Sequence, residues 1–411
     1  MRVLYLNPCG QLGGAENSLL EVLTSVIAAE PNWELWLVLG EDGPLAREAQ
    51  KLGVQVMIAP FPDALAQLGD SGNRAPAIAW SGLKATGGTA FYAWRLARIV
   101  KAIQPDVIHT NGFKMHILAL WARSHQTPVI WHIRDYVSSR SLMKRLLSIH
   151  ASRCKAAIGN SESVTRDIRS VCGPRLETCC VYNAVDLARY SPVGEKSDLD
   201  RLAGLPPAPS GAARVGLIAT LARWKGHQVF LRALAQLPHD LSYRAYVIGG
   251  PIYQTENSQR TLDELRSLAA ELGVADKVGF TGFVRESANA MRALDVVVHA
   301  STEAEPFGRV IAEGMACGRP VICSATGGAA ELIQDGYDAL AHPPGDAAAL
   351  ADRIAQLVRC PDLCARLGRA GRATAERRFE LGRLAAELIP LYERAVGHVS
   401  SDPAVQLAPL R

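Results

Sequence analysis

The sequence predicts an α/β protein built from two successive parallel-sheet domains, and three observations indicate this class. Short apolar runs alternate with longer segments of helical periodicity along the chain, which is the pattern of βαβ units. The runs VLYLN and WLVL are continuously apolar, as strands buried on both faces of a parallel sheet should be. The chain also has 411 residues, more than the ~250–300 that one packed domain usually holds.

Seven strands are expected in the first domain, residues 1–190. They are Val3–Asn7, Trp33–Leu39, Gln55–Ala59, Asp106–Asn111, Val129–Asp135, Ala156–Asn160 and Cys179–Asn183. Helices are expected between them, for example at Ala15–Ala29 and Ser161–Val171. Asp63–Phe91 shows no clear periodicity, so we expect a long loop there, of the functional or mobile kind.

A linker is expected at residues 191–212, because the sequence around it is rich in Pro, Gly, Ser and charge. The alternation then restarts in a second domain, residues 213–375. Its expected strands are Val215–Leu221, Tyr243–Gly249, Val278–Phe283, Val296–Ala300 and Val321–Ser324, and its expected helices are Gly226–Gln236, Thr261–Leu272, Val310–Cys317 and Ala347–Val358. A terminal helix at 376–396 is expected to return to the first domain, and 397–411 to be a disordered tail. Ligands of such proteins gather at the carboxyl ends of the strands, here in the crevice between the domains.

Composition excludes several classes of protein. With 48% hydrophobic and 20% charged residues the chain is globular, and a net charge of +4 gives no case for a nucleic-acid binder. The first residues lack the pattern of a signal peptide, and no apolar run is long enough to span a membrane. The nine scattered cysteines favour a reducing cytoplasm, and Cys360 and Cys364 lack further ligands at zinc spacing. No metal or cofactor is expected.

A glycine pair opens the first expected helix, directly after the first strand. In Gln11–Glu16, Gly13 and Gly14 let the backbone turn sharply, and the free amides of the helix start favour an anion such as a phosphate. The dinucleotide pattern Gly-x-Gly-x-x-Gly is not met. An ordinary strand-to-helix turn is the alternative.

Two carboxylates flank another strand-to-helix turn in the second domain. Glu305 lies on a Glu-Pro-Phe-Gly turn and Glu313, eight positions later, lies in the first turns of a helix, so both can face one crevice. Carboxylates accept hydrogen bonds from sugar and ribose hydroxyls. The amides of Gly308, Arg309 and Val310 point out of the helix start, where an anion is favoured. A solvated helix face would explain Glu313 alone but not the whole segment.

This segment resembles the Glu-x7-Glu signature of the retaining nucleotide-sugar glycosyltransferases of the group 1 (family 4) class. The weaker motifs of that family follow in the expected order over most of the chain. They are the Gly-Gly-Ala-Glu turn, Pro105–Asn111, Asn160–Ser161, Val181–Asp186, Lys225–Gly226, Val247–Gly250, Phe280–Phe283 and Gly327–Leu332. The resemblance implies the GT-B fold, in which two Rossmann-like domains face a cleft. It also implies that the first domain binds the acceptor and the second binds the nucleotide-sugar donor.

By that resemblance, a set of second-domain residues holds the donor. Glu313 would hold the ribose hydroxyls, and Glu305 would contact the donor sugar. The backbone of Phe307 and Gly308 would contact the sugar, and that of Arg309 and Val310 the diphosphate. The turns at Gly249 and Val284 would contact the base. The Gly13–Gly14 turn would contribute to donor binding from the first domain.

Lys225 is the expected cation for the departing diphosphate, because it lies between a strand and a helix start. The family usually has an arginine five positions earlier, where this chain has Thr220. Arg223 is close enough in sequence to take that place. An exposed Lys and Arg at a helix start is the alternative.

The strand around VIWHIRD carries a third set of polar residues. Alternation places His132 and Arg134 on one face. The family has a histidine here that contacts the donor sugar, and residue type favours His132 while alignment on Asp135 favours Arg134. A buried structural histidine is the alternative. Glu16, Arg134, Asn111 and Lys114 are the acceptor-side candidates.

The helix that carries Arg95, Arg98 and Lys101 also carries Phe91, Tyr92 and Trp94. Such a basic, aromatic helix could contact the inner membrane surface or a lipid-diphosphate acceptor. A solvated helix with one packed face is the alternative.

Together with these observations, the resemblance implies a cytoplasmic, metal-independent, retaining hexosyl-type glycosyltransferase of cell-surface polysaccharide or glycolipid synthesis. It would move a sugar from a UDP- or GDP-linked donor to a glycan or lipid-linked acceptor. An epimerase or a phosphorylase on the same fold, and a non-enzymatic small-ligand binding protein, are the alternatives. A glycosidase fits less well, because Glu305 and Glu313 suit donor binding better than acid/base work.

Overall fold

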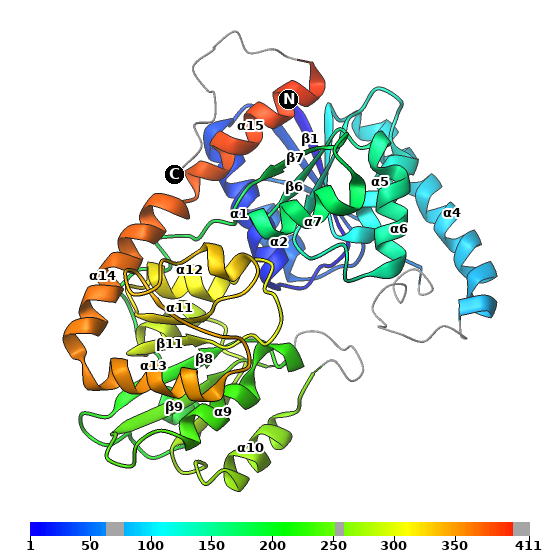
Figure 1. Ribbon diagram of the computed structural model, residues 1–411. Coiled ribbons are helices and arrows are strands. Elements are labelled where there is room, and N and C mark those ends of the chain that lie inside the picture. The colour runs from blue at the N-terminus through cyan, green and yellow to red at the C-terminus, as the bar shows by residue number, and fades with distance from the viewer. Residues whose placement is uncertain (63–77, 251–258, 398–411) are drawn as a thin grey trace.

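The computed structural model describes residues 1–62, 78–250 and 259–397, of which 78–86 are described by their backbone alone. It contains two parallel sheets, which confirms the predicted fold class (Figure 1). The first sheet has the order β3-β2-β1-β4-β5-β6-β7 and the second β10-β9-β8-β11-β12-β13. In each sheet the chain starts in the middle and winds outward to both edges, as in doubly wound folds.

The seven strands of the first sheet lie close to their predicted positions. They are β1 (Arg2–Asn7), β2 (Glu34–Leu39), β3 (Gln55–Ile58), β4 (Val107–Asn111), β5 (Val129–Ile133), β6 (Ala156–Gly159) and β7 (Glu177–Cys180). One face of this sheet packs against α1 (Gly14–Ala29), α2 (Pro44–Lys51) and α15 (Gly382–Val396). The other face packs against α4 (Ile78–Ile103), α5 (Phe113–Ala122), α6 (Ser141–His150) and α7 (Glu162–Cys172).

The second sheet contains one strand that the sequence analysis missed. Its strands are β8 (Ala213–Ile218), β9 (Tyr243–Ile248), β10 (Val278–Gly282), β11 (Val296–His299), β12 (Val321–Ser324) and the missed β13 (Leu340–His342). Three residues are too few to show a periodicity. The helices on its two faces are α9 (His227–Ala235), α10 (Leu262–Glu271) and α13 (Ala347–Arg359) on one side, and α8 (Leu199–Leu202), α11 (Ser287–Arg292) and α12 (Arg309–Ala316) on the other.

The last helices connect the two domains. α14 (Pro361–Arg378) contacts α12 of the second domain, and α15 contacts α1 of the first (Figure 1). Tyr392 of α15 is fully buried, and its hydroxyl is hydrogen-bonded to His109 of β4 at 2.7 Å. The end of the chain is thus part of the first domain's core, and residues 398–411 lie outside the described part.

The prediction of a loop over Asp63–Phe91 is wrong for residues 78–91, which form the first half of α4. Tyr92, Leu96, Val100 and Ile103 have helical spacing and are buried in the core. The earlier residues include several glycines, which lower helix propensity and obscured the pattern. Residues 63–77 lie outside the described part of the chain.

Candidate active site

The glycine turn before α1 is capped by the protein itself. Gly13 has extended backbone, and its amide donates to the buried Glu16 carboxylate at 3.2 Å. Burial raises the pKa of Glu16, while the Gly13 amide lowers it in part. This glutamate, expected on the acceptor side, therefore serves at least to hold the helix start. A side-chain carbon added at Gly14 would lie 3.5 Å from Arg309, so this turn faces the second domain.

Glu305 sits at the centre of a buried polar cluster at the carboxyl end of β11. Its carboxylate accepts hydrogen bonds from Lys225 Nζ at 2.8 and 3.0 Å and from Ser301 Oγ at 2.8 Å. His299 Nε2 lies 3.2 Å away. Burial alone would raise the pKa of Glu305, but Lys225 and His299 lower it well below its ordinary value. Glu305 is therefore an ionised, fixed carboxylate.

Lys225 is held in place by a turn that only glycine can make. It ends a short 3-10 turn, Arg223–Lys225, and is followed by Gly226 with φ 75°. A side-chain carbon at Gly226 would lie 1.7 Å from the carbonyl oxygen of Ala300, just after β11. The ammonium lies 3.9 Å from the centre of the Trp224 ring. The predicted pair Lys225 and Glu305 is thus in direct contact.

Arg223 takes a different direction from Lys225. Its guanidinium lies 3.9 Å from the Glu264 carboxylate of α10, and its side chain is 45% exposed. The structure therefore places Arg223 on the α10 side of the turn.

Glu313 is bridged to the first domain by Arg309. Gly308 caps α12 with φ 93°, so the helix begins at Arg309. The Arg309 guanidinium lies 2.9 Å from Glu313 and binds the Glu21 carboxylate of α1 at 2.6 and 2.7 Å. It also donates to Ser18 Oγ at 2.9 Å. Burial would lower the pKa of Arg309, but Glu21 and Glu313 raise it, so the arginine stays charged between two carboxylates.

A second set of contacts joins the domains beside Glu305. Tyr136 of the first domain donates to the Glu305 carbonyl at 3.3 Å. Glu331 of the second domain accepts hydrogen bonds from the amides of Glu162 and Ser163, at the start of α7, and from Tyr182. A carboxylate at a helix start is favoured by the free amides and the helix dipole. The Glu-x7-Glu segment therefore contacts the first domain at two places, through the side chain of Arg309 and through the carbonyl of Glu305.

His132 and Arg134 occupy different depths in the first domain. His132 lies within β5 and is fully buried, whereas Arg134 lies beyond the strand end and is half-buried. Arg134 donates to Asn183 Oδ1 at 2.6 Å and to His132 Nδ1 at 3.2 Å. Burial lowers the pKa of Arg134 to about 10 and that of His132 well below its usual range.

The proton positions of the buried histidines follow from Arg134, because a guanidinium can only donate. His132 Nδ1 must then be an acceptor, and His109 Nε2 lies 3.1 Å from the same nitrogen. On the other side of the His109 ring, Nδ1 lies 2.7 Å from the Tyr392 hydroxyl. Neutral His132 therefore carries its proton on Nε2, which has no hydrogen-bond partner among the described residues.

Asn111 ends β4 in register with His132. It is buried, and within the described part of the chain neither atom of its amide group has a hydrogen-bond partner. Lys114, in the first turn of α5, lies 5.9 Å from the centre of the Phe61 ring. These two acceptor-side candidates share one edge of the sheet, although only Asn111 adjoins His132.

The donor-side positions predicted for backbone contacts are all at turns. Gly249 has φ 140° and follows β9, and a side-chain carbon there would lie 1.9 Å from the Ala219 carbonyl oxygen. Val284 follows β10 and is partly buried in the core. Phe307 is buried against Phe379 and Tyr182, so its side chain belongs to the core and only its backbone is available. Val310 is half-buried in the first turn of α12.

Sequence reasoning missed several residues of this region. Glu21, Ser18, His299, Ser301 and Tyr136 contact the predicted residues from elsewhere in the chain. Ser301 and His299 carried a local signal, since they lie four and six positions before Glu305. Glu21, Ser18 and Tyr136 are brought in by packing between elements that are distant in sequence.

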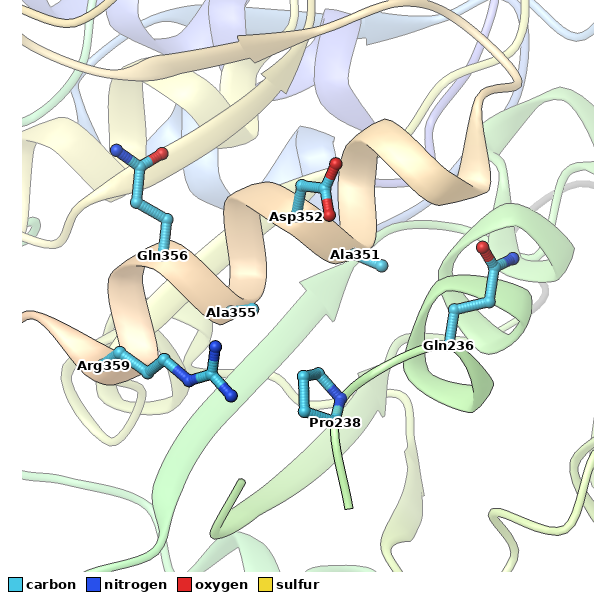
Figure 2. A pocket seen from close by; sticks show the side chains of 7 residues that line it. All are labelled: Gln236, Pro238, Ala351, Asp352, Ala355, Gln356 and Arg359. Atoms are coloured by element: carbon cyan, nitrogen blue, oxygen red, sulfur yellow. The ribbon is translucent and has the colours of Figure 1, made fainter. Parts of the chain in front are cut away.

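Figure 2 shows a surface hollow in another part of the second domain. It is lined by Gln236 and Pro238, just after α9, together with Asp352, Gln356 and Arg359 of α13. Because α9 starts at the carboxyl ends of the strands and runs back along the sheet, its end lies at the opposite edge. This hollow is therefore separate from the cluster around Glu305.

No group of three or more metal-ligating side chains was found in residues 1–62, 78–250 and 259–397. The same part of the chain contains no helix long and apolar enough to cross a membrane.

Comparison with known families identifies the chain. A model described as "Glycosyl transferases group 1" matches residues 206–374, and one described as "Glycosyltransferase Family 4" matches residues 44–189. The chain belongs to the group 1 (family 4) glycosyltransferases. This finding confirms the family that the Glu-x7-Glu segment predicted.

Individual proteins are similar to this glycosyltransferase over different extents. A D-inositol 3-phosphate glycosyltransferase of Actinosynnema mirum is 35% identical over 222 residues, which cover 51% of this chain and 50% of that protein. The chain thus spans about half the length of this curated relative. The structure of Anabaena HepE in complex with UDP-glucose has a TM-score of 0.76 at 23% identity, covering 96% of this chain and 100% of that one. Sucrose-phosphate synthase of Thermosynechococcus elongatus has a TM-score of 0.72 at 20% identity, covering 96% and 98%. At these identities, the similarity of this chain to the two solved structures shows a shared fold alone.

Proposed function

We propose that this enzyme transfers a hexosyl unit from a nucleoside-diphosphate sugar to a glycan or lipid-linked acceptor with retention at the anomeric carbon. The observation that carries the proposal is the buried contact between Lys225 and Glu305 at 2.8 Å. It places a cation and a fixed carboxylate together beside the start of α12. Sugar transfer needs this combination, because negative charge develops on the leaving diphosphate while the sugar must be held.

In the proposed arrangement the second domain, residues 213–375, binds the donor. Glu313 accepts the ribose hydroxyls, and Glu305 accepts hydroxyls of the donor sugar. Arg309 binds a single oxygen of Glu313, Oε1, through Nε at 3.1 Å, which leaves Oε2 for ribose. The amides of Phe307, Gly308, Arg309 and Val310 and the turns at Gly249 and Val284 hold the sugar, diphosphate and base, with Gly13 and Gly14 opposite.

In the proposed reaction the acceptor hydroxyl attacks the anomeric carbon on the face from which the diphosphate leaves. The bond between the anomeric carbon and the phosphate oxygen breaks, and its electron pair goes to the diphosphate, beside Lys225. The acceptor oxygen forms the new bond, and its proton passes to the departing phosphate oxygen. The step takes no electron from a cofactor, and we propose that it needs no metal.

The first domain, residues 1–190, is proposed to hold the acceptor and one side of the donor sugar. Its candidates are His132, Arg134, Asn111, Glu16 and Lys114. Since His132 Nε2–H is a buried donor aligned with Asn111, a sugar hydroxyl is a suitable partner for it. A UDP-linked donor is supported by the fold shared with HepE, which was solved with UDP-glucose. We propose a cytoplasmic enzyme of cell-surface polysaccharide or glycolipid synthesis that works at the inner membrane surface.

A thermal-shift panel of nucleotide sugars tests the proposed donor site. We expect stabilisation by one UDP- or GDP-sugar, and loss of it in Glu313→Gln. The exposed Glu303, two residues before Glu305, gives a matched control, Glu303→Gln, which should keep the shift. Stabilisation that persists in Glu313→Gln would contradict the ribose role.

Release of nucleoside diphosphate and of sugar in the presence of EDTA tests the chemistry. A retaining transferase should pass its sugar slowly to water, and NMR should first show the anomer of the donor. Binding without any release would indicate a non-enzymatic protein. Release of a different sugar would indicate an epimerase. Loss of activity in EDTA would contradict metal independence.

A further inference from the structure

The charges of this chain are strongly segregated, although its net charge is small. Residues 78–155 contain twelve Lys and Arg but only two Asp and no Glu. The remaining residues hold 32 basic and 38 acidic side chains of the chain's 44 and 40. The segment therefore carries more than the entire positive excess of the protein.

The same segment forms three neighbouring helices on one face of the first sheet. α4 contacts α5, and α5 contacts α6 (Figure 1). None of the three helices contains an acidic residue. Lys144 and Arg145 on α6 and Arg98 and Lys101 on α4 are exposed.

Large apolar side chains are exposed on these helices as well. Five of the ten exposed large apolar residues in the described part of the chain are Phe91, Trp94, Trp121, Leu142 and Ile149. Phe91 and Trp94 stack at 5.8 Å, and Arg98 lies 5.1 Å from the centre of the Trp94 ring. Amphipathic aromatic rings among cations are typical of surfaces that enter the headgroup layer of a bilayer.

We propose that the face made by α4, α5 and α6 docks on an anionic lipid bilayer. The charge complementarity is with lipid phosphates, and the exposed aromatic and aliphatic side chains enter the interface. α5 follows the carboxyl end of β4 and α6 follows that of β5, so both helices start toward the edge where the candidate active site lies. The active-site edge of the sheet therefore borders the docking face. The proposal rests on the proposed function in one respect, the lipid-linked acceptor that this position would serve.

Co-sedimentation of the full-length protein with vesicles tests the docking face. We expect binding to vesicles of phosphatidylcholine with phosphatidylglycerol, and none to phosphatidylcholine alone. Each cation near such a surface contributes about fivefold in affinity, so Lys144→Gln/Arg145→Gln should weaken binding about 25-fold. Trp94→Ala should weaken it about tenfold, because its buried ring area is lost.

Matched controls lie in the linker and the second domain. Lys196 is exposed in the linker and Tyr337 is 51% exposed in the second domain, so Lys196→Gln and Tyr337→Ala should bind as the parent does. Equal loss in the controls, or no binding to anionic vesicles, would overturn the proposal. A different outcome would also overturn it. The variants of α4 and α6 could abolish self-association or binding of single-stranded RNA while they still bind the vesicles.

The vesicle experiment can refute the docking face independently of the proposed function. It needs no donor, so a protein that binds vesicles but is stabilised by no nucleotide sugar would contradict sugar transfer only. A protein that is stabilised by a nucleotide sugar but ignores anionic vesicles would contradict the docking face only.

Discussion

The ion pair between Glu21 and Arg309 should be a main contribution to the association of the two domains. The two side chains are 11% and 14% exposed, and the guanidinium binds both carboxylate oxygens, at 2.6 and 2.7 Å. Removing one partner of a buried pair costs about 3–5 kcal/mol, because the other charge is left without compensation. Glu21→Gln leaves Arg309 with Glu313, so we expect the lower end, about 3 kcal/mol in free energy of unfolding.

A double-mutant cycle isolates the interaction itself. It uses Glu21→Gln, Arg309→Met and the double variant, with the free energy of unfolding taken from urea titrations. The ion pair of Arg166 and Glu331 offers a matched interdomain control. It spans 3.9 Å with Arg166 72% exposed, so its coupling energy should be about 0–1 kcal/mol.

The expected result is a coupling energy of about 2 kcal/mol or more for Glu21 with Arg309. Donor affinity should fall in Arg309→Met as well, because Glu313 loses the group that orients it. A coupling energy no larger than that of the control pair would refute the reasoning. The two domains would then be held by the contacts of Glu331 and by α14 and α15 instead.

Three further outcomes follow from buried charges and tight turns. Lys225→Met should lower turnover by about 10²–10³-fold. It should also lower the free energy of unfolding, since Glu305 loses its cation. Adding Glu305→Gln should restore the free energy of unfolding in urea titrations but not turnover. Gly226→Ala should destabilise by well over the about 1–2 kcal/mol that left-handed backbone alone costs, whereas Gly53→Ala, with φ 86° and open space around it, should cost only that amount. Burial lowers the pKa of His116 to about 3, so as the pH falls below about 6.5 the unfolded state binds this proton before the folded state does, and the folded protein loses stability. Between pH 6 and 4, His116→Asn should reduce the fall in the free energy of unfolding by about 1.4 kcal/mol per pH unit. A free energy of unfolding that falls with pH as steeply as in the parent would contradict this.

The order of elements and the fold class follow from the sequence alone. Apolar runs such as VLYLN and WLVL identify buried strands because their period is local, and the Glu-x7-Glu segment identifies the family. The prediction failed where local pattern is weak. β13 has three residues, and the glycines at the start of α4 hid a helix whose stability comes from Tyr92, Leu96 and Val100 in the core.

The same division applies to the candidate site. The Glu-x7-Glu segment identified Glu305 and Glu313, and residue types near strand ends identified Lys225 and His132, because parallel strands bring their carboxyl ends to one edge. Their partners could not be read from the sequence. Lys225 is 80 positions from Glu305. Their ion pair depends on how the 3-10 turn Arg223–Lys225 and the segment after β11 meet at the carboxyl ends of the strands.

The sequence by itself determined the two α/β domains, the family and the strand ends that carry polar residues, since these depend on periodicity and short motifs. Only the tertiary structure decided which charges meet. It placed Arg309 between Glu313 and Glu21, and it set the Nε2 proton of His132 through Arg134. The contact of Arg309 with Glu21 joins residues 288 positions apart, and burial makes its energy depend on packing that no local pattern records.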